Sequence, residues 1–387
     1  MNRKQFMALF LCSLTTWLVG VSIMPILPLY AAKLGASSAT TGYYLAFSFA
    51  MLAAGTMLAG RLSNRLGRRR ELIVLAGVVA LPATWLMGRV TTIWQLTLLT
   101  SVVWFAAGVA LTLQNVLMGL FADKARRGRM FGLLASTTSL AGLIGGLVVG
   151  RVADHWGYTR LFALLALVWI VQVSAGLLLP DTGTAVPSKS PATLIPRRKF
   201  SKPFWLLLGA NMLVTTSASV GMMGGSLRMN DQGISLTLIT LLAAVQAGLG
   251  LMANPIAGRL SDKLNRKTVL TIAYSGRALG LVALMLATSP AGFWLMAICF
   301  TIAFTKDAVS PALVTDMAGD GQLDSHMAAF TAGNWSGHVI GFVLAGMAMQ
   351  FLGASTTFLL AALLPLSAIL VVAHLAEGVG ETAVVSA

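Results

Sequence analysis

The chain has 387 residues, of which 57% are hydrophobic and only 10% are charged, and its mean hydropathy is +0.82. A water-soluble domain carries about 25% charged residues, so this composition excludes a soluble globular protein and indicates that lipid surrounds most of the chain. Cys12 and Cys299 both lie in apolar runs, which argues against an extracellular disulfide framework.

Twelve apolar runs follow one another along the chain, each long enough to cross a bilayer as a helix of about 20 residues. Membrane-spanning strands would instead show alternating segments of about 10 residues. The first run is too long for a secretory signal and is predicted to be the first membrane helix. The runs lie near residues 6–30, 42–60, 71–88, 93–121, 130–150, 160–179, 203–227, 236–258, 268–288, 292–315, 327–350 and 354–376.

The net charge of +15 is explained by topology. With the N-terminus in the cytoplasm, 20 of the 27 Lys and Arg residues fall on the cytoplasmic side, five fall outside and two lie within spans. Such a bias is the positive-inside rule. It predicts an integral protein of the plasma (inner) membrane with both termini in the cytoplasm, and no nucleic-acid partner.

A repeat divides the chain into two halves. "GRLSNRLGRRR" at 60–70 recurs as "GRLSDKLNRKT" at 258–268, each time after the second of six spans. The longest polar interruption, rich in Pro, Ser and basic residues, lies between the halves and is typical of an exposed linker. We therefore expect a six-helix bundle at 1–179, a cytoplasmic linker at 180–202 and a second six-helix bundle at 203–387.

The repeated loop resembles the motif between helices 2 and 3 of the major facilitator superfamily. Asn64 replaces the usual Asp in the first copy, whereas the second copy keeps Asp262 but has Asn265 at the second Gly. The matching residues of the first copy are Gly60, Leu62, Ser63, Arg65, Gly67, Arg68 and Arg69. The resemblance implies an all-α integral membrane fold of 12 transmembrane helices in two pseudo-symmetric six-helix bundles. It also implies a secondary transporter with a central site near the midplane.

The fifth run, "GLLASTTSLAGLIGGLVVG" at 132–150, is similar to the Gly-rich helix of drug and proton antiporters. It lacks their Gly-Pro pair, because Gly145 and Gly146 stand at that place. Small residues also let helices approach closely in lipid. The run therefore favours export only mildly over ordinary tight packing.

Asp307 is the only one of 12 carboxylates deep within a span. It lies nine residues from Asp316, and Arg277 lies nine residues from Thr268, so both are about 14 Å from the same end of adjacent spans. Charges at such depth are functional candidates, since they are costly unless paired or wetted. A structural cluster that neutralises itself is the alternative, although Arg277, Lys306 and Asp307 leave one positive charge over. The corresponding part of the first half, "WFAAGVALTLQN" at 104–115, carries no charge.

We expect Asp307 to turn toward Arg277 and carry the proton, with His338 as a second candidate. Neighbouring residues of a helix point about 100° apart, so Lys306 is then expected to face the cavity and bind an anionic or polar substrate. The opposite rotation would place Asp307 in the cavity and favour a cationic drug. Five further polar residues within spans are candidates for lining the cavity, or for simple helix–helix hydrogen bonding: Gln114, Asn115, Asn211, Gln246 and Asn334.

A cytoplasmic gate is predicted from the loop motif and the acidic loop before the eleventh span. In the family the two approach each other when the protein opens outward, so the acidic loop is expected to supply the charge that Asn64 lacks. The predicted gating residues are Gly60, Asn64, Arg65, Gly67, Arg68, Arg69, Asp262, Arg266, Asp316 and Asp320.

The predicted function is proton-coupled transport of a small organic compound, and export is favoured over uptake. The transporter is expected to be a monomer and to need no cofactor. No Gly-x-x-x-x-Gly-Lys-(Ser/Thr) sequence is present to bind ATP, and the four His residues have no metal-ligand spacing, so an enzyme is not expected. Uptake of an organic anion is the alternative within transport. A membrane receptor or lipid-handling protein is the alternative outside it.

Overall fold

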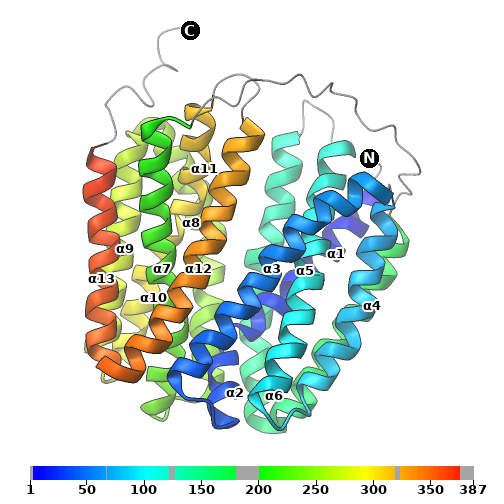
Figure 1. The fold of residues 1–387 in the computed structure, drawn as a ribbon, viewed down its shortest axis with the longest axis horizontal. Coiled ribbons are helices and arrows are strands. Elements are labelled where there is room, and N and C mark those ends of the chain that lie inside the picture. The colour runs from blue at the N-terminus through cyan, green and yellow to red at the C-terminus, as the bar shows by residue number, and fades with distance from the viewer. Residues whose placement is uncertain (1–2, 67, 122–126, 180–199, 319–322, 375–387) are drawn as a thin grey trace, which may run out of the picture. The chain divides into compact units, whose positions relative to one another are not determined.

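The computed structural model describes residues 3–66, 68–121, 127–179, 200–318 and 323–374, and these ranges form helices without strands. Figure 1 shows the helices with their labels. Their bounds are α1 (Arg3–Ile23), α2 (Leu27–Lys33), α3 (Ser38–Leu66), α4 (Arg69–Met87), α5 (Ile93–Phe121), α6 (Arg127–Leu177), α7 (Lys202–Asp231), α8 (Leu236–Lys263), α9 (Arg266–Leu286), α10 (Pro290–Phe304), α11 (Lys306–Met317), α12 (Leu323–Leu352) and α13 (Ala354–Ala373).

Eleven helical stretches in the described ranges are long and apolar enough to cross a membrane, and one of them contains two spans. The stretch Met130–Leu177 has 48 residues and would be about 72 Å long if straight, whereas the hydrocarbon core is about 30 Å thick. Gly157 interrupts it with φ 74° and ψ 174°, values that a residue with a side chain rarely adopts. The twelve predicted spans and the all-α membrane fold are therefore confirmed.

Two of the spans are broken within their length. The first is divided into α1 and α2 at Met24–Ile26, where Pro25 and Pro28 limit helical hydrogen bonding. The tenth is divided into α10 and α11 at Thr305. Pro311, within α11, has no N–H to offer the carbonyl of Asp307 four residues earlier, and its ring crowds that carbonyl, which favours a bend there.

The chain divides into two compact units. Unit 1 comprises Met1–Ala36, Phe47–Ile195 and Ser235–Ala244, and unit 2 comprises Ser37–Ala46, Pro196–Ile234 and Val245–Ala387. The first turns of α3 and α8 are thus grouped with the unit that holds the other half of the sequence. The predicted linker lies almost wholly outside the described residues, and the predicted boundaries at 179 and 203 stay a prediction.

Unit 1 is held together by close helix crossings on the Gly-rich part of α6. A Cβ added at Gly145 would collide with Ser22 of α1, and one at Gly146 or Gly150 would collide with the first turns of α8 at Thr240 and Leu236. These glycines therefore serve the tight packing that is available to small residues in lipid.

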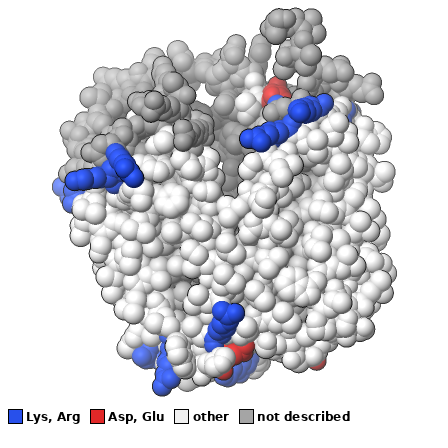
Figure 2. Space-filling view, turned by 180° about the vertical axis from the view of Figure 1, so that it is seen from behind, with Lys and Arg blue, Asp and Glu red and all other residues white. Residues whose placement is uncertain are grey.

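Unit 2 packs α7, α9, α11, α12 and α13 around an apolar core that includes Phe204, Leu270, Leu313 and Phe330. In Figure 1, α7, α9 and α13 lie side by side. Large apolar side chains such as Leu279 and Leu370 are exposed, as expected for a surface in contact with lipid. Figure 2 shows Lys, Arg, Asp and Glu near the two ends of the visible face, with an uncharged surface between them.

Candidate functional site in unit 2

The break in the tenth span places two charged residues at the first turn of α11. Around Thr305 the helix tightens, because the Thr305 N–H donates to the Ile302 carbonyl at 3.1 Å and the Ala308 N–H donates to the Thr305 carbonyl at 3.2 Å. These are bonds between residues three apart, as in a 3₁₀ turn. Broken helices of this kind line the binding sites of many transporters.

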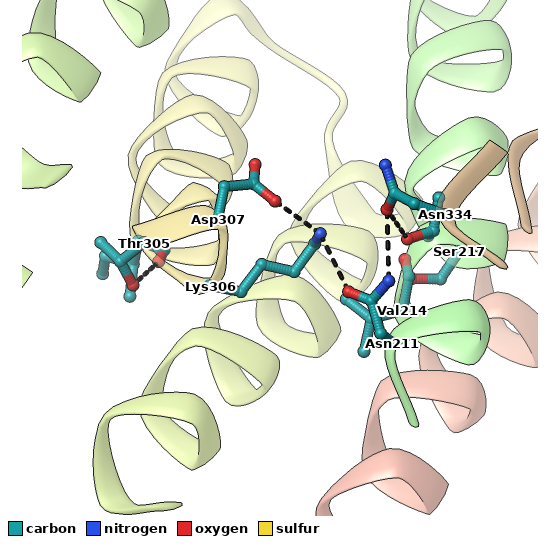
Figure 3. Close-up of polar contacts among 9 residues, drawn as sticks. Asn211, Val214, Ser217, Thr305, Lys306, Asp307 and Asn334 are labelled. Atoms are coloured by element: carbon teal, nitrogen blue, oxygen red, sulfur yellow. Dashed lines mark hydrogen bonds and ion pairs between the residues drawn. The ribbon is translucent and has the colours of Figure 1, made fainter. Parts of the chain in front are cut away.

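The Lys306 side chain points into the interior of unit 2, where only 7% of it is exposed. Its ammonium donates to the Asp307 carboxylate at 2.7 Å and to the Asn211 side-chain oxygen at 3.3 Å (Figure 3). The charge is thus paired and hydrogen-bonded, which a buried cation requires.

Asp307 occupies the opposite kind of environment, since 55% of its side chain is exposed. It lines a pocket of about 160 Å³ between α11 and α12. The pocket is also lined by Ser310, Pro311, Met327, Phe330, Thr331, Asn334 and Trp335. A carboxylate therefore stands on an otherwise largely aromatic and apolar wall.

The orientation expected for the two neighbours is reversed in the structure. Lys306 was expected to face the cavity and Asp307 to face Arg277, whereas Asp307 faces the pocket and Lys306 is buried. The physical reason is the polar lining that α7 offers: Asn211 is fully buried and supplies an oxygen that accepts from the Lys306 ammonium inside the unit.

Arg277, on α9, is buried among aromatic rings. Its guanidinium lies 4.5 Å from the centre of the Phe300 ring and 5.5 Å from that of Phe304. Within the described ranges no ion pair joins it to Asp307, so the predicted contact is not formed in this state. The tight α9–α10 contact places the rings, since a Cβ at Gly280 would collide with Phe300.

A chain of hydrogen bonds extends from Lys306 to α12. Asn211 donates from its amide nitrogen to the Asn334 side-chain oxygen at 3.2 Å, and Thr215 donates to the same oxygen at 3.0 Å. One turn further along both helices, Ser219 and the His338 ring nitrogen Nδ1 are 2.9 Å apart. The predicted candidates Asn211, Asn334 and Lys306 are therefore brought together, with His338 on the same α7–α12 contact.

The other predicted lining residues lie elsewhere. Gln114 is buried in unit 1, where it donates to Thr16 at 3.4 Å, and Asn115 is exposed on α5. Gln246 is half-buried on α8. Among the described residues, no group of three or more His, Cys, Asp or Glu could hold a metal ion.

The predicted gating residues are only partly described. The side chains at Gly60, Asn64, Arg65, Gly67, Asp262 and Asp320 lie outside the described set. Arg68 pairs with Glu71 at 3.4 Å on the exposed start of α4. Asp316 pairs with Arg266 of α9 at 2.5 Å, so two gating candidates meet each other within the second repeat. A role for any of them in gating stays a prediction.

Several residues of the site were not among those predicted. Thr215, Ser310, Phe330 and Trp335 are common in ordinary membrane helices, and their place at the site depends on helix rotation. One signal was available in the sequence: Asn211 and Thr215 are four residues apart, and Asp307 and Ser310 are three apart, which places each pair near one helical face.

Comparisons with known proteins agree with this architecture. The sequence profile described as "Major Facilitator Superfamily" matches residues 6–305 and 207–382. The chain is 25% identical to multidrug resistance protein MdtG of Klebsiella pneumoniae over 342 residues, covering 82% of this chain and 81% of that protein. It is 26% identical to the protein of the same name from Proteus mirabilis over 330 residues, covering 81% and 80%.

The fold is also similar to a solved structure, that of a peptide transporter POT in complex with sulfate. The TM-score is 0.79, the identity is 14%, and the match covers 97% of this chain and 95% of that one. At this identity the likeness concerns the fold alone. Together, the twelve spans, the broken tenth span and the profile match over almost the whole chain establish that it belongs to the Major Facilitator Superfamily of transporters.

Proposed function

We propose that this transporter exports small cationic organic compounds in exchange for protons, and that Asp307 binds the cargo and the proton in turn. One observation carries the proposal: the Asp307 carboxylate is more than half exposed in a pocket with Phe330 and Trp335, while the neighbouring cation is buried. A carboxylate beside aromatic faces attracts a cation through both charge and ring quadrupole.

The dimensions of the pocket favour recognition of one end of the cargo. A site that encloses a whole drug-sized ligand has about 300–1,000 Å³, whereas this pocket has about 160 Å³. It would take the charged group of a larger apolar molecule. Such partial recognition suits a transporter with many substrates, and the curated relatives that bear the name multidrug resistance protein support this reading.

Proton coupling follows from competition at a single carboxylate. Asp307 can hold a proton or face a cationic cargo, and each excludes the other because both neutralise the same charge. The Lys306 ammonium pairs with the empty carboxylate at 2.7 Å, and Arg277 provides a second cation that a shift of α11 against α9 could bring nearer. His338 bonds to Ser219 on the α7–α12 contact, so we give it a structural role.

Uptake of an organic anion has less support. It would need a cation that faces the pocket, and the Lys306 ammonium is instead held by Asn211 and Asp307. The proposed location is the plasma (inner) membrane with cytoplasmic termini, which is supported by the placement of 20 of 27 Lys and Arg residues on one side.

The test uses purified protein in proteoliposomes, with ethidium as the cationic probe and an imposed pH gradient as the driving force. Asp307→Asn should abolish gradient-driven ethidium movement and weaken ethidium binding by about 10–100-fold, the loss expected for a hydrogen bond or contact to a charged group. Asp307→Glu should retain part of both activities, because it keeps the carboxylate.

Two variants serve as controls. His338→Ala should keep gradient-driven movement, and Lys306→Ala should bind ethidium at least as tightly as the native protein, because it frees Asp307 of its competitor. The proposal is wrong if Asp307→Asn still couples to the gradient while His338→Ala does not. Loss of binding in Lys306→Ala, with normal binding in Asp307→Asn, would instead indicate an anionic substrate.

A further inference from the structure

Arg277 is a buried cation of unit 2 that lacks a polar partner in the part of the chain that the structure describes. It is 2% exposed, yet within the described residues its guanidinium takes part in no hydrogen bond and no ion pair, and its Nε atom is fully enclosed. An arginine carries five N–H donors and no acceptor. A buried charge of this kind is strongly destabilising unless something accepts those donors.

Two hydroxyl groups beside Arg277 share this condition. Tyr274 lies one turn earlier on α9 and is fully buried, and Ser310 of α11 is 1% exposed. Their hydroxyls face each other across the α9–α11 contact and interact, and neither has any other hydrogen-bond partner among the described residues. A guanidinium and a facing pair of hydroxyls, all buried and with donor capacity left over, therefore lie within about one turn of α9.

The balance of charge at this depth is positive. Arg277 and Lys306 are cations, and Asp307, which pairs with Lys306, is the one carboxylate among them. The rings of Phe300 and Phe304 attract the guanidinium, but a cation–π contact is weaker than the cost of burying an ion.

We propose that Arg277, Tyr274 and Ser310 bind a small monovalent anion of the size of chloride between α9 and α11. Such an ion accepts hydrogen bonds from all three groups and neutralises the surplus charge, which a water molecule does not. Ser310 also lines the Asp307 pocket, so the ion can enter from that side.

The site is distinct from the cargo pocket in both charge and ligand. It does not depend on what the transporter carries, and it gives Arg277 a partner in the state in which Asp307 is held by Lys306. If Asp307 moves toward Arg277 during transport, the ion and the carboxylate compete for the same guanidinium. Asp307→Asn should then bind the ion more tightly than the native protein does.

The test is the apparent melting temperature of the purified protein in detergent, measured in potassium chloride and in potassium gluconate at equal ionic strength. Chloride should raise the melting temperature by a few degrees relative to gluconate, because a ligand that binds only the folded state stabilises it. Ser310→Ala and Tyr274→Phe each remove one donor without adding charge and should weaken the apparent chloride affinity by about tenfold. Arg277→Gln should abolish the chloride effect.

The matched control is Arg89→Gln, which removes the same charge from an exposed arginine that also stacks on an aromatic ring, that of Trp85. It should keep the full chloride effect. Equal melting temperatures of the native protein in chloride and gluconate would overturn the proposal. A chloride effect that persists unchanged in both Ser310→Ala and Tyr274→Phe would overturn it too, since the ion would then bind elsewhere.

Discussion

The fourth and tenth spans occupy corresponding places in the two repeats but differ in continuity and charge. The fourth is a single helix, α5, of 29 residues. The tenth is divided at Thr305 into α10 and α11. At the repeat offset of 198 residues, Lys306 and Asp307 correspond to Gly108 and Val109, which are uncharged and packed in unit 1.

The polar interiors of the two units differ in the same way. In unit 1 the buried polar contacts on α5 and its neighbours are neutral, such as Ser13 with Thr137 at 2.8 Å and Gln114 with Thr16 at 3.4 Å. In unit 2 the buried network includes an ammonium and a carboxylate. Neutral contacts suffice to hold helices together, so the costly charges of unit 2 support the proposal that the cargo binds in this half.

The largest expected effect comes from placing a proline in the unbroken fourth span, at the position that corresponds to Pro311. Leu113 of α5 corresponds to Pro311 of α11 and is fully buried. Leu113→Pro should destabilise unit 1 by about 3 kcal/mol or more beyond the loss in a Leu113→Ala control, because proline removes a hydrogen bond and clashes with the preceding turn. Thermal unfolding in detergent measures the difference.

Removing the proline from the tenth span should leave stability unchanged and impair transport. Pro311→Ala restores the missing N–H, so its melting temperature should not fall, while transport should fall at least tenfold because a straighter span moves Lys306 away from Asn211. A Pro311→Ala protein that transports normally would show that the break at Thr305 does not matter for function.

A smaller difference in stability is expected between variants of two buried amides, Asn211 in unit 2 and Gln114 in unit 1. Asn211→Ala leaves Lys306 without one of its two acceptors and Asn334 without one of its two donors, so it should cost about 2–3 kcal/mol. Gln114→Ala removes one long, neutral hydrogen bond and should cost about 1 kcal/mol. Chemical denaturation of the two variants, side by side, checks the ranking; equal costs would mean that Lys306 gains little from its amide partner.

The smallest effect concerns the loops of the repeated motif. The Arg266–Asp316 pair is partly shielded, with side chains 23% and 31% exposed, whereas Arg68 and Glu71 are 71% and 57% exposed. Asp316→Asn should cost up to about 1 kcal/mol at low salt, and Glu71→Gln only a few tenths. Raising the salt concentration should shrink the first difference, and an Asp316→Asn protein as stable as the native one would leave the pair without a structural role.

The spans and the charged residues within them could be predicted from the sequence, because hydropathy and the cost of buried charge depend on residue type alone. The division of α6 at Gly157 was located by the polar residues between its two apolar stretches. The break at Thr305 was not predicted, although Pro311 was visible, because many prolines in membrane helices are accommodated without dividing the helix.

The direction in which Lys306 and Asp307 point could not be predicted. Two rotations of the tenth span satisfy the same hydropathy, and the choice depends on Asn211, which lies 95 residues away and on a different helix. The same holds for the contact of Asn211 with Asn334: each amide was a candidate, but their pairing requires the relative rotation of α7 and α12. Arg277 could be predicted as a site residue from its charge, whereas its contacts with Phe300 and Phe304 depend on how α9 and α10 pack.

The hydrogen bonds from Lys306 through Asn211 to Asn334 have a direction. Lys306 donates to the oxygen of Asn211, whose nitrogen donates to the oxygen of Asn334. Thr215 donates to that oxygen as well, so Asn334 accepts twice, which polarises its amide and leaves the nitrogen as the free end of the series. Because Asn334 lines the pocket, a guest there meets a strengthened donor beside the acceptor Asp307. We therefore expect the proposed cargo pocket to distinguish the two ends of a dipolar molecule as well as its charge.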